Sequence, residues 1–196
     1  LPFLYNLMKS DVYIGEIMNN NIKGDGILIK RNKLLIKGRY DSLNYIDRVD
    51  ISMIDKDLDN IYLKGSIINN KFVYGVVSYG NIKLEGEFED GLPNKSCKYN
   101  SDDVIYDGEW DKGVMSGLGY YEDKNIKYQG EWVDNKFEGD GLLFEDNIEY
   151  NGLFRLGKKH GSGDLIENGI KYYVEYENDK EILKLDSKEK KIIDLL

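Results

Sequence analysis

The sequence has one cysteine, one histidine and two prolines among its 196 residues. A single cysteine, Cys97, excludes a disulfide within the chain and suits a reducing compartment such as the cytosol. With His160 as the only histidine, a zinc site built from Cys and His clusters is also excluded. No run of about 18 apolar residues occurs, so the sequence predicts no transmembrane helix. We expect no metal and no cofactor.

Positive charge is also scarce, because 27 Lys and Arg stand against 36 Asp and Glu and give a formal net charge of -9. Duplex nucleic acid and anionic membranes attract clustered Lys and Arg, so this balance disfavours both as general partners. We predict no nucleic-acid partner. In the C-terminal half, Arg155, Lys158 and Lys159 are the cations that could form a small patch for an anionic ligand.

Glycine and tyrosine are abundant, with 21 and 16 residues, and they recur in a fixed frame. Three segments carry it most clearly: YDGEWDKGVMSGLGY from Tyr106, YQGEWVDNKFEGDGL from Tyr128 and YNGLFRLGKKHGSGD from Tyr150. Their leading tyrosines are 22 residues apart. Each has glycine two residues after the tyrosine, an aromatic residue at four, and glycines at 11 and 13. Such periodicity predicts a repeat architecture.

Less regular copies extend the frame over most of the chain. A well-formed copy begins at Tyr13, and degenerate copies begin at Ile36, Leu63, Leu84 and Tyr172. The spacing of 27 residues between Ile36 and Leu63 predicts an insertion within Tyr45–Asn60. Asp55–Asn60 imitates the start of a calcium loop but lacks its glycine and its final glutamate, so we interpret it as a solvated acidic turn.

Within a copy, polar and apolar residues alternate up to the aromatic position, which is typical of a half-buried strand. Asn and Gly then provide a tight turn, and a second strand passes through the two glycines. Glycine weakens a strand, so two at fixed positions imply close approach of another group. We predict that Trp110, Trp132 and Phe154 lie across glycines of their own or a neighbouring hairpin. A Glu recurs three residues after the leading position, and we interpret it as structural rather than catalytic.

The pattern Y-x-G-E-W-x-x-G-x-x-x-G-x-G from Tyr106 resembles the MORN (membrane occupation and recognition nexus) repeat. The predicted fold is all-β: a single-layer antiparallel β-hairpin repeat solenoid of about seven to eight repeats over residues 1–185. Residues 186–196 are predicted to form a short C-terminal capping or docking α-helix, because Asp186 and Glu189 make a capping box.

The resemblance implies a non-catalytic protein-interaction scaffold in a cytoskeletal or membrane-associated assembly, often as a homodimer. The predicted partner site is an acidic groove lined by the aromatic row; core packing is the alternative role of these rings. The row consists of Tyr106, Trp110, Tyr128, Trp132, Tyr150 and Phe154.

Two other functions stay open at this point. The family name implies a phosphoinositide or membrane-surface module, although the net charge disfavours anionic lipid. SET-domain lysine methyltransferases and lipid kinases can carry MORN repeats beside their catalytic domains. The chain starts without methionine, so it is expected to be a piece of a longer protein and could be the regulatory part of such an enzyme. We expect a cytoplasmic location, peripheral to a membrane or the cytoskeleton, or a nuclear one in a SET-domain protein.

Overall fold

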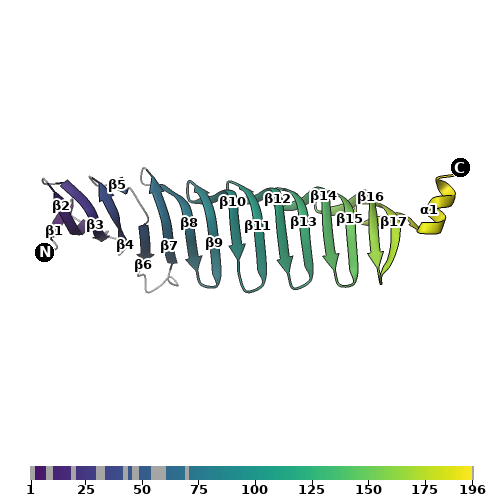
Figure 1. The fold of residues 1–196 in the computed structure, drawn as a ribbon, viewed down its shortest axis with the longest axis horizontal. Helices are drawn as coiled ribbons and strands as arrows, with labels where there is room; N and C mark the ends of the chain where they lie inside the picture. Colours follow the sequence, from purple (N-terminus) through teal and green to yellow (C-terminus); the bar gives the residue numbers. More distant parts are fainter. Residues whose placement is uncertain are drawn as a thin grey trace. The chain divides into compact units, whose positions relative to one another are not determined.

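The computed structural model describes residues 3–7, 11–18, 21–29, 34–41, 44–45, 49–53, 61–68 and 71–195, with side chains from residues 64–66, 72–78 and 80–195. The chain divides into two compact units, Leu1–Asp102 and Asp103–Leu196. In each unit the strands are antiparallel and consecutive strands pair, as predicted for a β-hairpin repeat array (Figure 1).

The described residues of the first unit form ten strands, which follow one another along the chain. They are β1 (Phe3–Leu7), β2 (Asp11–Met18), β3 (Asn21–Ile29), β4 (Leu34–Asp41), β5 (Asn44–Tyr45), β6 (Val49–Met53), β7 (Ile61–Ile68), β8 (Lys71–Tyr79), β9 (Ile82–Glu89) and β10 (Leu92–Asn100). β4 pairs with both β5 and β6, so the regular hairpin order is interrupted here. Residues 46–48 and 54–60 lie outside the described residues. The predicted insertion within Tyr45–Asn60 and the acidic turn at Asp55–Asn60 therefore stay predictions.

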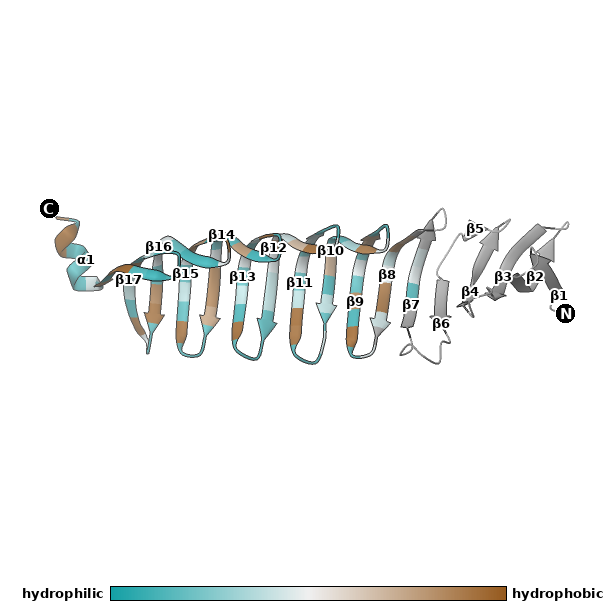
Figure 2. Cartoon of the chain, turned by 180° about the vertical axis from the view of Figure 1, so that it is seen from behind, coloured by the Kyte–Doolittle hydropathy of each residue, from teal (hydrophilic) through white to brown (hydrophobic). Residues whose placement is uncertain are grey.

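The second unit contains eight strands and one helix. They are β11 (Val104–Asp111), β12 (Val114–Asp123), β13 (Ile126–Val133), β14 (Lys136–Glu145), β15 (Ile148–Arg155), β16 (Lys158–Glu167), β17 (Ile170–Glu177), β18 (Lys180–Asp186) and α1 (Ser187–Ile193). Figure 2 shows hydrophobic residues returning at the same level of successive hairpins. Each strand pair is one copy of the repeat, and the copy from Tyr172 forms the last hairpin.

The hairpin tips are two-residue turns in which both residues have positive φ, for example Asp134 (48°) and Asn135 (63°). Asn and Gly favour this conformation, as the sequence indicates. Three tips, at Asn135, Gly157 and Asp179, also bind the preceding hairpin. The backbone N–H groups of Asn135 and Gly157 donate to the carbonyls of Met115 (3.0 Å) and Phe137 (2.9 Å). We call these contacts the tip hydrogen bonds.

The hairpins of the second unit bend sharply where the register shifts, between Gly130 and Glu131 in β13 and at equivalent points of β11 and β15. Gly139 stands opposite this shift with φ of 58°. The bend gives the sheet two different faces. We call the one that carries Tyr106, Tyr128 and Tyr150 the inner face, and the opposite one the outer face.

On the inner face the leading tyrosine of each copy covers the glycine at position 13. A Cβ added to Gly141 would lie 2.5 Å from Cε2 of Tyr128, and one added to Gly163 would lie 2.6 Å from Cε2 of Tyr150. Trp132 and Phe154 stand opposite Gly117 and Gly139 of the neighbouring hairpin, so the prediction that the rings at position four lie across glycines holds for these two. Gly130 pairs with Gly141, and the Tyr128 ring, two residues before Gly130, leans along the strand over both.

A copy in the first unit departs from this arrangement in two places at once. Leu84 stands at the tyrosine position, and Cys97 stands at the glycine position opposite Gly86. The Cys97 side chain is 2% exposed. Leucine is shorter than tyrosine, so it leaves the volume that the cysteine side chain occupies. The two departures are therefore matched.

The predicted C-terminal helix is present. Asp186 caps α1 by accepting hydrogen bonds from the N–H groups of Lys188 (2.8 Å) and Glu189 (2.9 Å), and the Glu189 carboxylate accepts from the Asp186 N–H (2.9 Å). None of the helix residues is buried, and Ile192 and Ile193 are exposed. Among the described residues, no helix has the length and apolar character needed to cross a bilayer.

Candidate functional site

The predicted aromatic row lies on the inner face and forms its core. Tyr128 is 0% and Trp132 3% exposed, and Tyr106, Tyr150 and Phe154 are also buried. Trp110 alone of the six is partly exposed. The rings meet edge to face, with centroid distances of 5.3 Å between Tyr106 and Trp132 and between Tyr128 and Trp132. Most of the row is therefore out of reach of a partner in the folded chain.

The tyrosine hydroxyls explain why this position is not phenylalanine. The Tyr106 hydroxyl donates to the Glu109 carbonyl (2.9 Å), and that of Tyr128 donates to the Glu131 carbonyl (3.0 Å). Tyr150 binds the Leu153 carbonyl in the same way (3.2 Å). These carbonyls stand at the bend, where the strand register shifts, so the hydroxyl supplies a donor to a backbone acceptor beside the core.

Burial of the tyrosines predicts a loss of stability in alkali. Burial is the main factor that raises the pKa of Tyr150 to about 12, and burial followed by the hydrogen bond to Asp123 raises the pKa of Tyr121 to about 12. The pKa values of Tyr106 and Tyr128 are also raised, mainly by burial. Unfolded tyrosine ionises near pH 10, so the unfolded chain loses protons first as the pH rises.

We therefore expect the free energy of unfolding to fall progressively from about pH 10 through about pH 12. Urea unfolding followed by circular dichroism at several pH values checks this expectation, with tyrosinate absorbance recorded in parallel. The buried tyrosines should ionise together with the loss of the fold. Full tyrosine ionisation near pH 10 in a chain that stays folded would contradict the assignment of these rings to the core.

The recurring glutamate belongs to the bend, in line with its interpretation as structural. The Glu109 carboxylate accepts from the Leu118 N–H (3.3 Å). The Glu131 carboxylate lies against Gly139, where an added Cβ would be 2.6 Å from Oε2. Both carboxylates thus stand beside a left-handed glycine of the facing strand.

The three predicted cations do not share one surface. Arg155 and Lys158 are exposed and lie opposite each other across the hairpin of β15 and β16. Lys159 follows Lys158 in an extended strand, so it points to the other face. Its ammonium lies above the rings of Tyr150 (5.5 Å) and Tyr176 (5.7 Å). Two cations remain for an anionic ligand on the outer face. In the described part of the chain, no group of three His, Cys, Asp or Glu residues could hold a metal ion.

A hollow of about 520 Å³ opens on the inner face beside the core. Phe137, Phe154 and Tyr176 provide its aromatic wall, and Glu145 and Glu181 contribute acidic groups. Phe154 is the one member of the predicted aromatic row that lines it. The hollow is thus a part of the predicted groove that remains open on this face.

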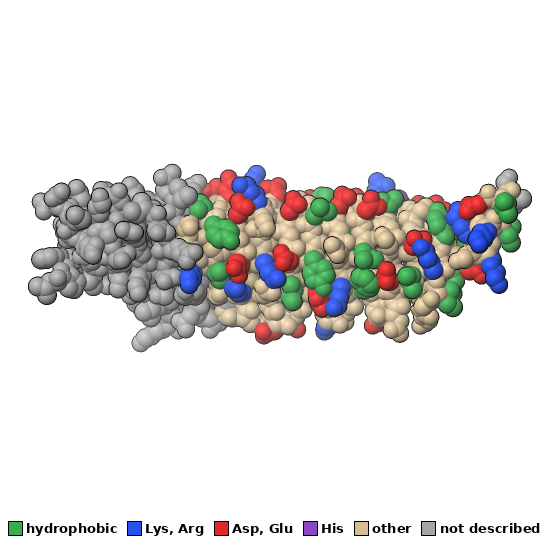
Figure 3. Space-filling view, viewed as in Figure 1, with side chains coloured by type: hydrophobic (Ala, Val, Ile, Leu, Met, Phe, Trp, Pro, Cys, Tyr) green, Lys and Arg blue, Asp and Glu red, His purple; other side chains and the backbone are tan. Residues whose placement is uncertain are grey.

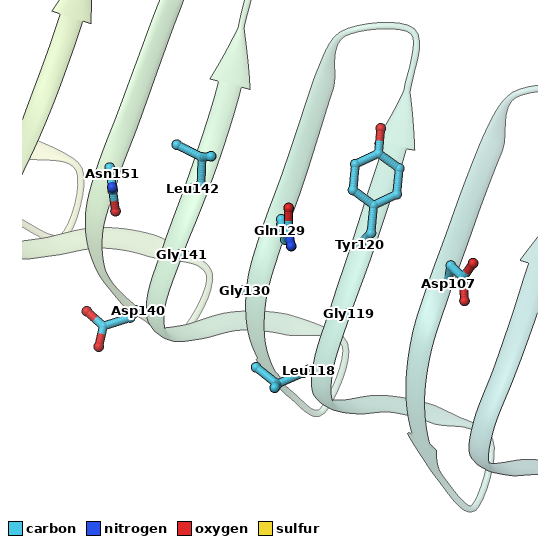
Figure 4. A pocket seen from close by; sticks show the side chains of 10 residues that line it. All are labelled: Asp107, Leu118, Gly119, Tyr120, Gln129, Gly130, Asp140, Gly141, Leu142 and Asn151. Atoms are coloured by element: carbon cyan, nitrogen blue, oxygen red, sulfur yellow. The ribbon is translucent and has the colours of Figure 1, made fainter.

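A second and larger hollow lies on the outer face and was not predicted. Glycines of neighbouring strands pair across the sheet, Gly119 with Gly130 and Gly130 with Gly141. On the outer face the backbone of these strands is the floor of a channel of about 630 Å³ (Figure 4). We call it the outer channel. Two rows of side chains line it: Asp107, Tyr120, Gln129, Leu142 and Asn151 on one side, and Leu118 and Asp140 on the other.

The outer channel combines apolar side chains with acidic ones. Leu118 is 62% exposed and Leu153, which pairs with Asp140, is 41% exposed. Figure 3 shows such exposed hydrophobic side chains among charged ones on one face of the described strands. Glu131, opposite Leu118, and Asp140 are exposed carboxylates. None of the described residues that line the channel is Lys or Arg.

Comparison with known proteins identifies the repeat. Residues 106–125, 128–146 and 150–166 match the family model of the MORN repeat. This match confirms the resemblance predicted from the copies at Tyr106, Tyr128 and Tyr150. No curated protein matches the chain.

Proposed function

Since residues 106–125, 128–146 and 150–166 are three consecutive MORN repeats, we propose that the chain is a protein-interaction scaffold that holds its partner in the outer channel. MORN repeats are generally associated with protein or membrane interaction, and proteins built from them are typically non-catalytic. The observation that supports the channel as the docking surface is a pair of exposed leucines: Leu118, which lines it, and Leu153, which pairs with the lining residue Asp140.

Exposed leucines beside a channel are typical of a surface that a partner covers. The channel floor is also preorganised. Tyr128 packs against Gly141 from the inner face, and its ring stacks on that of Phe137 with the centroids 3.8 Å apart, so the Tyr128 ring supports the backbone of the channel floor. A rigid floor lowers the cost of ordering on binding, which favours affinity. The aromatic row contributes this rigidity, and its buried rings need no contact with the partner.

Serine at both Leu118 and Leu153 is expected to reduce partner capture at least about tenfold, because about 1.4 kcal/mol of lost apolar burial corresponds to that factor. The measurement is a quantitative pull-down from native extract with the immobilised chain. Ile182→Ser is the matched control, since Ile182 is 52% exposed on β18, outside the channel. The control should retain every protein that the leucine variant loses. Equal capture by all three proteins would overturn the channel as the docking surface.

Vesicle flotation, with and without phosphoinositides, separates protein binding from membrane binding. The scaffold proposal expects little flotation at about 150 mM salt, where exposed charges are screened beyond about 8 Å. Flotation that survives this salt and is lost when Arg155 and Lys158 are changed to glutamate would favour the membrane-surface function instead.

A further inference from the structure

We infer that the outer channel takes an extended segment of a partner protein in which a lysine or arginine stands midway between two apolar residues four positions apart. This inference rests on the proposed function and names the kind of partner. Its basis is the order of side chains on four consecutive strands: Leu118 on β12 and Asp140 on β14 line the channel, and their cross-strand partners are Glu131 on β13 and Leu153 on β15.

The register fixes this order. Leu118 lies opposite Glu131, and Asp140 lies opposite Leu153. Gly130 pairs with Gly141. Glu131 follows Gly130 and Asp140 precedes Gly141, so these two residues lie beside each other at the bulge. Two carboxylates therefore stand between two exposed leucines on four consecutive strands.

The spacing selects an extended segment. Neighbouring strands are about 4.8 Å apart, so Leu118 and Leu153, three strands apart, are separated by about 14 Å. In an extended chain that runs across the strands, every second side chain points the same way, at intervals of about 6.8 Å. Residues i and i+4 of the segment thus meet the two leucines, and residue i+2 meets the two carboxylates.

A helix fits this order poorly. It rises about 1.5 Å per residue, so about nine residues would separate the two leucine contacts. Nine residues make about two and a half turns, and the second side chain would point away from the channel.

The charge selects a basic residue at the central position. Glu131 and Asp140 are exposed and, within the part of the chain that has described side chains, neither has an ion-pair partner. Other carboxylates differ: Asp164 pairs with Lys171 (2.9 Å) and Glu122 with Lys127 (2.9 Å). A lysine or arginine of the segment would thus form ion pairs with Glu131 and Asp140, while the apolar residues on either side of it are buried against the two leucines.

Synthetic peptides test the inference on the full chain. Thr-Leu-Thr-Lys-Thr-Leu-Thr carries the inferred pattern. Thr-Leu-Thr-Glu-Thr-Leu-Thr reverses the central charge, and Thr-Leu-Leu-Lys-Thr-Thr-Thr keeps the composition but breaks the spacing. With the peptides displayed on a dense array, we expect the first to retain about tenfold more protein than either of the others.

Charge reversal in the protein makes the test specific. The variant with Glu131→Lys and Asp140→Lys should prefer the Glu peptide over the Lys peptide. The matched control carries Glu145→Lys and Asp146→Lys, which change the net charge equally but neither line the channel nor pair with a residue that lines it. This control should keep the preference of the unchanged chain.

The outcomes separate this inference from the proposed function. Retention of the Lys and Glu peptides in equal amounts overturns the inference. The inference is also overturned if the variant with Glu131→Lys and Asp140→Lys still prefers the Lys peptide. The same holds if the broken-spacing peptide retains as much protein as the first peptide, or if no peptide retains any. The scaffold function itself fails only if capture of proteins from extract is also insensitive to Leu118 and Leu153.

Discussion

Alanine in place of Gly141 is expected to destabilise the chain by about 3 kcal/mol or more, because its Cβ would overlap the Tyr128 ring. The added carbon would lie 2.5 Å from Cε2 of that ring. The ring cannot move aside easily. Tyr128 is fully buried, stacks on Phe137 and donates its hydroxyl hydrogen bond to the Glu131 carbonyl.

Chemical denaturation followed by circular dichroism measures this effect. Gly157→Ala is the control, since Gly157 has φ of 84° but no atom would come closer than 3.8 Å to a Cβ there. It should cost only about 1 kcal/mol, the strain of a left-handed alanine. A loss at Gly141 no larger than that at Gly157 would show that the Tyr128 ring is not packed on this glycine.

The pairing of Leu84 with Cys97 suggests how the loss of stability from a side chain at Gly141 can be reduced. Tyr128→Leu removes the ring that an added side chain would meet, so Gly141→Cys should be tolerated better in that background than in the unchanged chain. We expect a coupling free energy of about 1–3 kcal/mol in the double-mutant cycle, as for residues in direct contact. If the changes in unfolding free energy of the two substitutions are additive, the interpretation of Leu84 and Cys97 as matched changes is wrong.

Alanine at Trp132 is the second large loss that the structure predicts, at about 3–5 kcal/mol. The indole is 3% exposed, touches the rings of Tyr106, Tyr121, Tyr128 and Phe137, and donates its Nε1–H to the Gly119 carbonyl (3.3 Å). Trp110→Ala should cost less, since Trp110 is partly exposed.

The comparison of the two tryptophans also tests how the aromatic row acts. The midpoints of urea unfolding for both variants give the stability difference, which should exceed about 1 kcal/mol. If the outer channel is the docking surface, Trp110→Ala should keep its partner while Trp132→Ala loses it together with the fold. A stable Trp132→Ala variant that fails to capture the partner would instead support direct contact by the aromatic row.

Sequence reasoning found what is local and periodic. The 22-residue spacing predicted the hairpins, Asp134 and Asn135 predicted a tip turn, and Asp186 with Glu189 predicted the helix start. These features depend on residues close together in the sequence, so they can be predicted from a single segment of the chain. The split of Lys158 and Lys159 between two faces was also within reach, because it follows from strand alternation alone.

The packing of the rings and the outer channel depend on relations between segments. Alternation shows that Tyr128 and Trp132 share a face, but not that a bulge after Gly130 bends the hairpin and buries both. It also cannot tell which ring leans over Gly141. The channel lies between side chains of neighbouring strands, such as Leu118 on β12 and Asp140 on β14, and it becomes visible only when these strands are aligned in register.

The tip hydrogen bonds make the two edges of the second unit unequal. Asn135 and Gly157 each link a tip to the preceding hairpin, so a change in length there would break a bond to a neighbour. The turns at the opposite edge make bonds within themselves, as where the Asp123 carboxylate accepts from the N–H groups of Asn125 and Ile126. We therefore expect extra residues to be tolerated at Lys124–Asn125 or Asp146–Asn147 rather than at the tips, and divergence among related chains should accumulate along that edge.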